Sequence, residues 1–167
     1  MTIRIGVIGT GVMGAGHASM LASQIAGCEV VAVADADEAR AKLVAGKVGA
    51  TRVFSDGKAL IGDTGVDAVV VASPDPTHHP LVMECLRQVK PVLCEKPLGT
   101  TLADAEGIAR TVSSRGTWFM QSFPKRFDPV TARLRAAVTT GELGRITLAR
   151  VRHGHFYGLQ PDFPQRW

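Results

Sequence analysis

Short apolar runs alternate with segments of helical periodicity along most of the chain. β-Branched and other apolar residues predict strands at residues 3–8, 29–34, 52–54, 67–72, 91–94 and 118–121. Helices are expected between them at residues 12–26, 37–47, 58–61 and 79–88 and from Thr101 onward, with Asp37 and Thr101 as N-terminal caps and Asp104 as the capping-box partner of Thr101. Right-handed crossovers turn such an alternation into a doubly wound parallel sheet with helices on both faces, which is an α/β fold.

The pattern changes after Phe127. Residues 129–140 predict an amphipathic helix that ends at Gly141, and residues 145–155 predict a further strand. We therefore expect one domain over residues 1–123 and the beginning of an incomplete α+β C-terminal domain over residues 124–167. Because an apolar strand without sheet partners tends to recruit a second chain, a homo-oligomer is also expected.

A glycine motif stands directly after the first predicted strand and opens the first predicted helix. It reads Gly9-Thr10-Gly11-Val12-Met13-Gly14, a GxGxxG pattern. The first glycine permits a tight turn, the second lets a pyrophosphate approach the backbone, and the third lets helix and strand pack closely. The N-terminus of the helix supplies N–H groups and the positive end of its dipole to the phosphates.

An acidic residue, Asp35, closes the second strand about 20 residues after this motif, where it would accept hydrogen bonds from the adenosine ribose. A glycine-rich turn alone is common in α/β proteins, but strand, helix and acid in register favour dinucleotide binding. Residues 1–123 are therefore predicted to be a Rossmann-type NAD(P)-binding domain. Asp35 favours NAD because its carboxylate would repel a 2′-phosphate. NADP stays open, since Arg40 lies too far into the next helix to be assigned as its determinant.

Polar segments follow the fourth, fifth and sixth predicted strands. They are Ser73-Pro74-Asp75-Pro76-Thr77-His78, then Glu95-Lys96-Pro97, and then residues 121–126. The carboxyl ends of parallel strands share one edge of a sheet, and open α/β sheets bind their ligands there. These segments are therefore expected to lie beside the glycine motif.

Four motifs together resemble the glucose–fructose oxidoreductase / inositol dehydrogenase (Gfo/Idh/MocA) family. They are GxGxxGxxH at residues 9–17, SPxxxH at 73–78, CEKP at 94–97 and RFDP at 126–129. The resemblance implies an NAD(P)-dependent oxidoreductase that transfers a hydride between a nicotinamide cofactor and a hydroxyl carbon of a sugar, inositol or related polyol. It also implies a cis peptide bond before Pro97.

By this resemblance, Lys96 is the catalytic lysine that hydrogen-bonds the substrate oxygen, and Glu95 lies near the nicotinamide ribose. The alternative for Lys96 is a solvated surface lysine. Reduction of a carbonyl leaves negative charge on its oxygen, which a positioned ammonium stabilises. The residues expected to contact the cofactor are Gly9, Thr10, Gly11, Val12, Met13, Gly14, Asp35, Ser73, Pro74, His78, Glu95, Lys96 and Arg126.

The remaining histidines have weaker assignments. His17 is expected to pack or to hydrogen-bond within the first helix rather than to do chemistry, and a contact on the cofactor side stays open for it. His153 and His155 share one face of a predicted strand and are candidate substrate contacts. No third ligand completes a metal site around this pair, so no metal is predicted.

Composition narrows the function classes further. A formal charge of +4 with no Lys/Arg cluster among aromatics argues against a nucleic-acid groove. The 3 cysteines show no CxxC spacing, and no apolar stretch reaches the roughly 20 residues of a membrane helix, so a cytoplasmic protein is expected.

Family members are roughly twice as long as this chain, and their second half completes the substrate site. The alternative function is therefore a non-catalytic dinucleotide-binding or sensing module, or an inactive fragment of such an enzyme.

Overall fold

The computed structural model describes residues 2–152, and a six-stranded sheet organises most of them. Its strands run in the order β3-β2-β1-β4-β5-β6, and every neighbouring pair is parallel. Each strand predicted up to residue 121 is present, with ends that differ by no more than one residue. The strands are β1 (Ile3–Ile8), β2 (Cys28–Ala34), β3 (Arg52–Phe54), β4 (Ala68–Val71), β5 (Val92–Cys94) and β6 (Phe119–Gln121).

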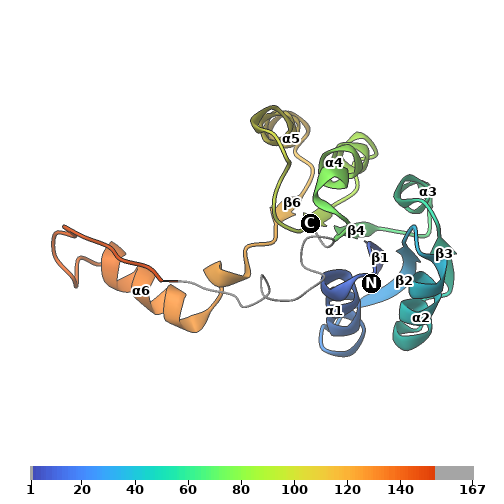
Figure 1. Cartoon of the computed structure of the whole chain (residues 1–167), viewed down its shortest axis with the longest axis horizontal. Coiled ribbons are helices and arrows are strands. Elements are labelled where there is room, and N and C mark those ends of the chain that lie inside the picture. The colour runs from blue at the N-terminus through green and yellow to red at the C-terminus, as the bar shows by residue number, and fades with distance from the viewer. Residues whose placement is uncertain (1, 153–167) are drawn as a thin grey trace, which may run out of the picture. The chain divides into compact units, whose positions relative to one another are not determined.

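Helices cover both faces of this sheet, as Figure 1 shows. On one face lie α1 (Val12–Ser23) and α2 (Glu38–Val48), and on the other lie α3 (Gly57–Gly62), α4 (His78–Arg87) and α5 (Leu102–Arg115). A short 3₁₀ helix, η1 (Asp75–Thr77), precedes α4. This is the doubly wound Rossmann arrangement that the alternation predicted.

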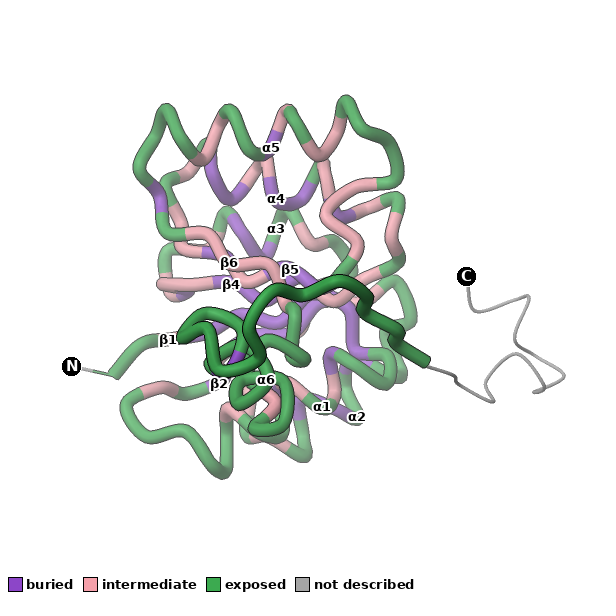
Figure 2. Tube along the Cα trace, turned by 90° about the vertical axis from the view of Figure 1, so that its left-hand side faces the viewer, coloured by how far each residue is buried: buried purple, intermediate pink, exposed green. Residues whose placement is uncertain are grey.

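Two apolar layers hold the helices on the sheet. Val7 and Val33 pack with Ala18 of α1 and Val44 of α2 on one face. Leu60, Leu86 and Ile108, from α3, α4 and α5, are all fully buried in the layer on the other face. Figure 2 shows the buried residues mainly in the central strands and on the inward sides of these helices.

The helix caps agree with the sequence, apart from two details. Asp37 accepts a hydrogen bond from the backbone N–H of Arg40, and Thr101 accepts one from Asp104. The Asp104 carboxylate, however, accepts from the Thr101 hydroxyl rather than from its backbone N–H. Helix α1 also ends at Ser23 instead of residue 26, because the chain must turn at Gly27, with φ of 82°, before β2 begins.

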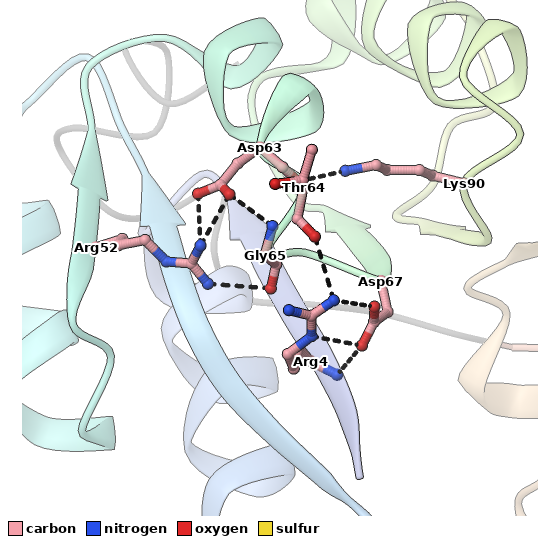
Figure 3. Close-up of polar contacts among 7 residues, drawn as sticks. All are labelled: Arg4, Arg52, Asp63, Thr64, Gly65, Asp67 and Lys90. Atoms are coloured by element: carbon pink, nitrogen blue, oxygen red, sulfur yellow. Dashed lines mark hydrogen bonds and ion pairs between the residues drawn. The ribbon is translucent and has the colours of Figure 1, made fainter. Parts of the chain in front are cut away.

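Ion pairs and hydrogen bonds join the first residues of β1 and β3 to the loop that precedes β4, and this loop to the one that precedes β5, at the amino ends of the strands (Figure 3). Arg4 of β1 donates to both carboxylate oxygens of Asp67, which immediately precedes β4. Arg52 of β3 binds Asp63, and the ammonium of Lys90 donates to the Asp63 carbonyl oxygen. This polar cluster therefore closes the end of the sheet opposite the glycine motif.

The chain divides into two compact units, Met1–Ser122 and Phe123–Trp167. In the second, η2 (Pro124–Arg126) precedes α6 (Pro129–Thr139), and the Asp128 carboxylate caps α6 by accepting from the N–H groups of Val130 and Thr131. That this unit begins a C-terminal substrate domain stays a prediction.

The prediction of a strand at residues 145–155 is wrong over residues 145–152, which form no strand. A strand needs a neighbour to satisfy its backbone N–H and C=O groups, and residues 145–152 pair with no other segment of the described chain. Residues 153–155 lie outside the described residues. Within residues 2–152, no helix is both long and apolar enough to cross a membrane.

Candidate functional site

The carboxyl ends of β1, β2, β4, β5 and β6 share one edge of the sheet, because all the strands are parallel. The predicted site segments 9–14, 35 and 95–97 each begin directly after one of these strands, and the segment 73–78 begins after β4 with only Ala72 between. The structure therefore brings the glycine motif, Asp35 and Lys96 to the same edge. Arg126 belongs to the second unit, and His153 and His155 lie outside the described residues.

Two glycines of the motif are required by close packing. Gly9 has φ of 86°, and a Cβ there would lie 2.5 Å from the carbonyl oxygen of Ala72 and from the backbone nitrogen of Ser73. A Cβ on Gly14 would lie 1.7 Å from the carbonyl oxygen of Gly9. The turn between β1 and α1 can therefore form next to the end of β4 only because both positions lack side chains.

Gly11 differs, because a Cβ there would meet nothing within 4 Å. It is the N-cap of α1, no side chain caps this helix, and the first turn holds no acidic residue. The N–H groups that begin a helix have no partners within it, and here the helix begins beside the open space at Gly11. This open space and these donors fit the pyrophosphate of a dinucleotide.

The Asp35 carboxylate lies next to the motif and is held by it. Its Oδ2 accepts from both the backbone nitrogen and the hydroxyl of Thr10, each at 2.7 Å, and its Oδ1 accepts from the backbone nitrogen of Asp37 at 2.9 Å. Burial would raise the pKa of Asp35, but hydrogen bonds from Arg40, Asp37 and Thr10 outweigh burial and hold it well below its usual range. Asp35 is therefore a fixed anion at the end of β2.

Arg40 also binds this carboxylate. Its Nη2 lies 2.7 Å from Oδ1 of Asp35 and its Nε 3.2 Å from Oδ2, and the contact raises the pKa of the guanidinium. From the sequence alone, Arg40 lies too far into the helix to be assigned as a cofactor determinant. In the structure it is the third residue of α2, so its side chain spans the distance back to the end of β2.

A second buried carboxylate, Glu95, follows β5 and is 5% exposed. Its Oε1 lies 2.8 Å from Nε2 of His17 and 2.9 Å from the hydroxyl of Ser122, and its Oε2 accepts from the backbone nitrogen of Lys96 at 3.2 Å. Burial acts to raise the pKa of Glu95, yet these hydrogen bonds, led by that of His17, bring it below its usual value.

Two of these partners differ from the sequence-based expectation. His17 was predicted to pack or to hydrogen-bond within its own helix, but it reaches a residue 78 positions away. Ser122 was not singled out, although its place directly after β6 was a usable signal.

Lys96 itself is exposed and is joined to Pro97 by a cis peptide bond, as the family resemblance implied. His78 holds the segment that contains it. The imidazole of His78 is buried, with Nδ1 2.7 Å from the carbonyl oxygen of Pro97 and Nε2 2.8 Å from that of Ser73. It therefore connects the segments that follow β4 and β5, which fixes the position of the turn beside Lys96.

The cysteines and the metal-binding residue types form no second site among residues 2–152. Burial raises the pKa of the Cys85 and Cys94 thiols to about 12, so neither supplies a thiolate near neutral pH. No group of three or more His, Cys, Asp or Glu side chains in this part of the chain is arranged to hold a metal ion.

Comparisons with known proteins agree with this geometry. The family model described as "Oxidoreductase family, NAD-binding Rossmann fold" (GFO_IDH_MocA) matches residues 3–123. Inositol 2-dehydrogenase 1 of Saccharopolyspora erythraea is 45% identical over 169 aligned residues, which cover 98% of this chain and 50% of that protein. Inositol 2-dehydrogenase of Acidothermus cellulolyticus is 45% identical over 153 residues, covering 91% of this chain and 45% of that protein.

Solved structures give the same result. The crystal structure of myo-inositol dehydrogenase from Lactobacillus casei in complex with NAD(H) and myo-inositol matches with a TM-score of 0.82 at 34% identity, over 86% of this chain and 43% of that one. Scyllo-inositol dehydrogenase from the same organism, crystallised with NAD(H) and scyllo-inositol, matches with a TM-score of 0.84 at 28% identity, over 88% of this chain and 44% of that one.

This chain spans about half the length of the curated relatives it matches. The matched half is the one that carries the glycine motif, the acidic residue after β2 and the Glu-Lys-Pro segment after β5. The chain belongs to the glucose–fructose oxidoreductase / inositol dehydrogenase family of oxidoreductases, with an NAD-binding Rossmann fold.

Proposed function

We propose that this protein is an NAD(P)-dependent oxidoreductase that transfers a hydride between the nicotinamide and a hydroxyl carbon of a polyol of the inositol class. The observation that carries the proposal is the convergence of the phosphate-binding turn, a fixed ribose-binding anion and Lys96 at one edge of the sheet. The names of the relatives, which are inositol dehydrogenases, support the choice of substrate class.

The cofactor half of the site follows from the residues described above. The N–H groups at the start of α1 hold the pyrophosphate beside Gly11, and Asp35 accepts hydrogen bonds from the ribose of the adenosine. Ser73, Pro74 and Glu95, at the ends of β4 and β5, contact the remaining length of the dinucleotide. When bound, the nicotinamide supplies the carbon that takes up or releases the hydride.

Lys96 supplies the catalytic group. Its ammonium hydrogen-bonds the substrate oxygen and stabilises the negative charge that develops as a carbonyl is reduced. In the oxidation direction its neutral amine accepts the proton of the hydroxyl while the hydride leaves for the nicotinamide. The buried Glu95 carboxylate accepts from the backbone nitrogen of Lys96 and thereby holds the chain at this point. Arg126, His153 and His155 stay predicted contacts, and homo-oligomerisation stays a predicted property.

Cofactor binding is tested on this chain by Gly11→Val. A Cβ at residue 11 meets no protein atom within 4 Å and Gly11 has φ of −66°, so the variant should fold with a stability close to that of the wild type. The branched side chain would occupy the space next to the backbone that the pyrophosphate requires. Isothermal titration with NADH should therefore show at least about tenfold weaker binding, a loss of roughly 1.4 kcal/mol. Equal affinity in wild type and variant would contradict the proposed site.

Turnover is tested with Lys96→Met in the full-length protein. NAD reduction is followed with a panel of inositols and other polyols, and a lysine-dependent rate on one of them supports the proposal. General acid–base groups contribute about 10²–10⁴-fold, so the variant should lose at least about 100-fold in kcat. Binding of NADH with no turnover on any polyol would favour the alternative, a non-catalytic dinucleotide-binding module.

A further inference from the structure

The Asp35 carboxylate has more hydrogen-bond donors around it than it has positions to accept them. A carboxylate offers about four lone-pair sites. Five donors lie within 2.7–3.2 Å of it, namely the backbone nitrogen and hydroxyl of Thr10, the backbone nitrogen of Asp37, and Nε and Nη2 of Arg40. A ribose hydroxyl that is to donate to Asp35 must therefore replace one of them.

Of these five donors, the two that belong to Arg40 are replaceable. The two backbone N–H groups are fixed by the turns at the ends of β1 and β2, and Thr10 is 2% exposed. The Arg40 side chain is 47% exposed, whereas that of Asp35 is 7% exposed. Arg40 therefore lies on the solvent side of Asp35, where a ribose would arrive, and it is carried by a flexible side chain.

The guanidinium also changes the charge that a cofactor meets. Asp35 alone would repel a 2′-phosphate, and this was the reason for favouring NAD. With Arg40 bound at 2.7 Å, the charges of Asp35 and Arg40 cancel, and the Asp37 carboxylate lies 3.3 Å from Nη1 of the same guanidinium. A guanidinium has five N–H donors in a fork that matches a phosphate, and two of them suffice for the contact with Asp35.

We propose that Arg40 decides between the two dinucleotides, so that this site accepts NADP as well as NAD. The side chain moves from Asp35 when a ribose diol donates to the carboxylate, and it binds the phosphate when the 2′ position carries one. This inference rests on the proposed cofactor site and adds to it the residue that sets cofactor choice.

The experiment compares the affinities of the full chain for NADPH and NADH by isothermal titration. Wild type is measured beside Arg40→Met, which removes the charge, and Arg40→Lys, which keeps it. Arg110→Met is the matched control, since Arg110 is also an exposed helical arginine paired with a carboxylate, that of Glu106 on α5. Circular dichroism establishes that each variant is folded, and Arg40→Gln replaces Arg40→Met if the latter is not.

The ratio of the NADPH to the NADH dissociation constant should rise about tenfold or more in Arg40→Met, the loss expected for a charge-assisted hydrogen bond to phosphate. Arg40→Lys and Arg110→Met should leave the ratio within about threefold of wild type, a difference below 1 kcal/mol. The inference is overturned if wild type fails to bind NADPH while binding NADH, or if Arg40→Met moves the ratio no more than Arg110→Met does. If wild type binds neither dinucleotide, the proposed cofactor site fails as well, which separates the two failures.

Discussion

His17 of α1 contacts Glu95, which directly follows β5, with Nε2 of the imidazole 2.8 Å from Oε1 of the carboxylate. Glu95 is buried, and its other partners are the Ser122 hydroxyl and the backbone nitrogen of Lys96. A buried carboxylate is stable as an anion only when such donors replace its hydration. His17 therefore acts on the conformation around Lys96 through Glu95.

Replacing His17 by Ala should destabilise the protein by roughly 1–3 kcal/mol at neutral pH, because it leaves a buried carboxylate oxygen with one donor fewer. The pKa of Glu95 should rise at the same time, since the hydrogen bond from His17 is the largest of the effects that lower it. Urea denaturation measures the first change, and NMR titration of the Glu95 carboxyl measures the second.

A double-mutant cycle with Glu95→Gln distinguishes this contact from a general effect on α1. If His17 stabilises the protein through Glu95, the loss of unfolding free energy caused by His17→Ala should be smaller by at least about 0.5 kcal/mol in the Glu95→Gln background. Equal costs in both backgrounds would show that His17 acts elsewhere.

His78 should contribute more to stability than its neighbour His79. Replacing His78 by Ala empties a buried site and removes the contacts to the carbonyl oxygens of Ser73 and Pro97, so a loss of roughly 2–5 kcal/mol is expected. His79 is partly exposed and lies 3.6 Å from Asp104, and exposed pairs of this kind contribute about 0–1 kcal/mol. Thermal or urea unfolding of the two alanine variants makes the comparison, and similar losses would contradict the bridging role of His78.

The sequence predicted the sheet and the location of the site because both depend on local patterns. Buried parallel strands are continuous apolar runs, and the polar segments that follow them at residues 73–78 and 95–97 must lie at one edge. The expected strand at 145–155 failed over residues 145–152, because an apolar run forms a strand only where a neighbour pairs with it.

The side-chain pairs within the site were not predictable in the same way. The contact of His17 with Glu95 joins residues far apart in the sequence, and periodicity carries no information on such pairs. The distance along the chain between Arg40 and Asp35 gave no reason to expect a contact. The contact forms because the first turn of α2 directs the Arg40 side chain toward Asp35, and the sequence does not reveal this direction. For Ser122 the only indication was its position directly after a predicted strand, and this position alone does not identify a site residue.

Two glycines of α1 should respond to alanine in opposite ways. Gly14→Ala places a Cβ 1.7 Å from the carbonyl oxygen of Gly9, so the turn must shift and a loss of about 1–3 kcal/mol or more is expected. Gly16 lies in the same helix with nothing within 4 Å of a Cβ, and alanine there should stabilise the protein by roughly 0.5–1 kcal/mol. Urea denaturation of both variants tests the contrast, which fails if Gly14→Ala is as stable as wild type.

The ion pair between Arg4 and Asp67, at the opposite edge of the sheet (Figure 3), should make stability depend on pH in the acid range. Hydrogen bonds from the Arg4 side chain and backbone lower the pKa of Asp67 to about 2, against 3.8 for an unperturbed group. Because the folded-state pKa lies below the unfolded one, the stabilisation is fully present above about pH 4 and is lost as the pH falls toward 2.

Asp67→Asn removes the titrating group, so the urea midpoint of the variant should fall less steeply than that of wild type between pH 4 and pH 2. Glu106→Gln removes an exposed carboxylate of α5 that pairs with Arg110, and it controls for the change in net charge. Its midpoint should follow the wild-type slope more closely than Asp67→Asn does. Parallel curves for wild type and Asp67→Asn over this interval would mean that Asp67 gains its protons at the same pH in the folded and unfolded chains, and the ion pair would then contribute no pH dependence.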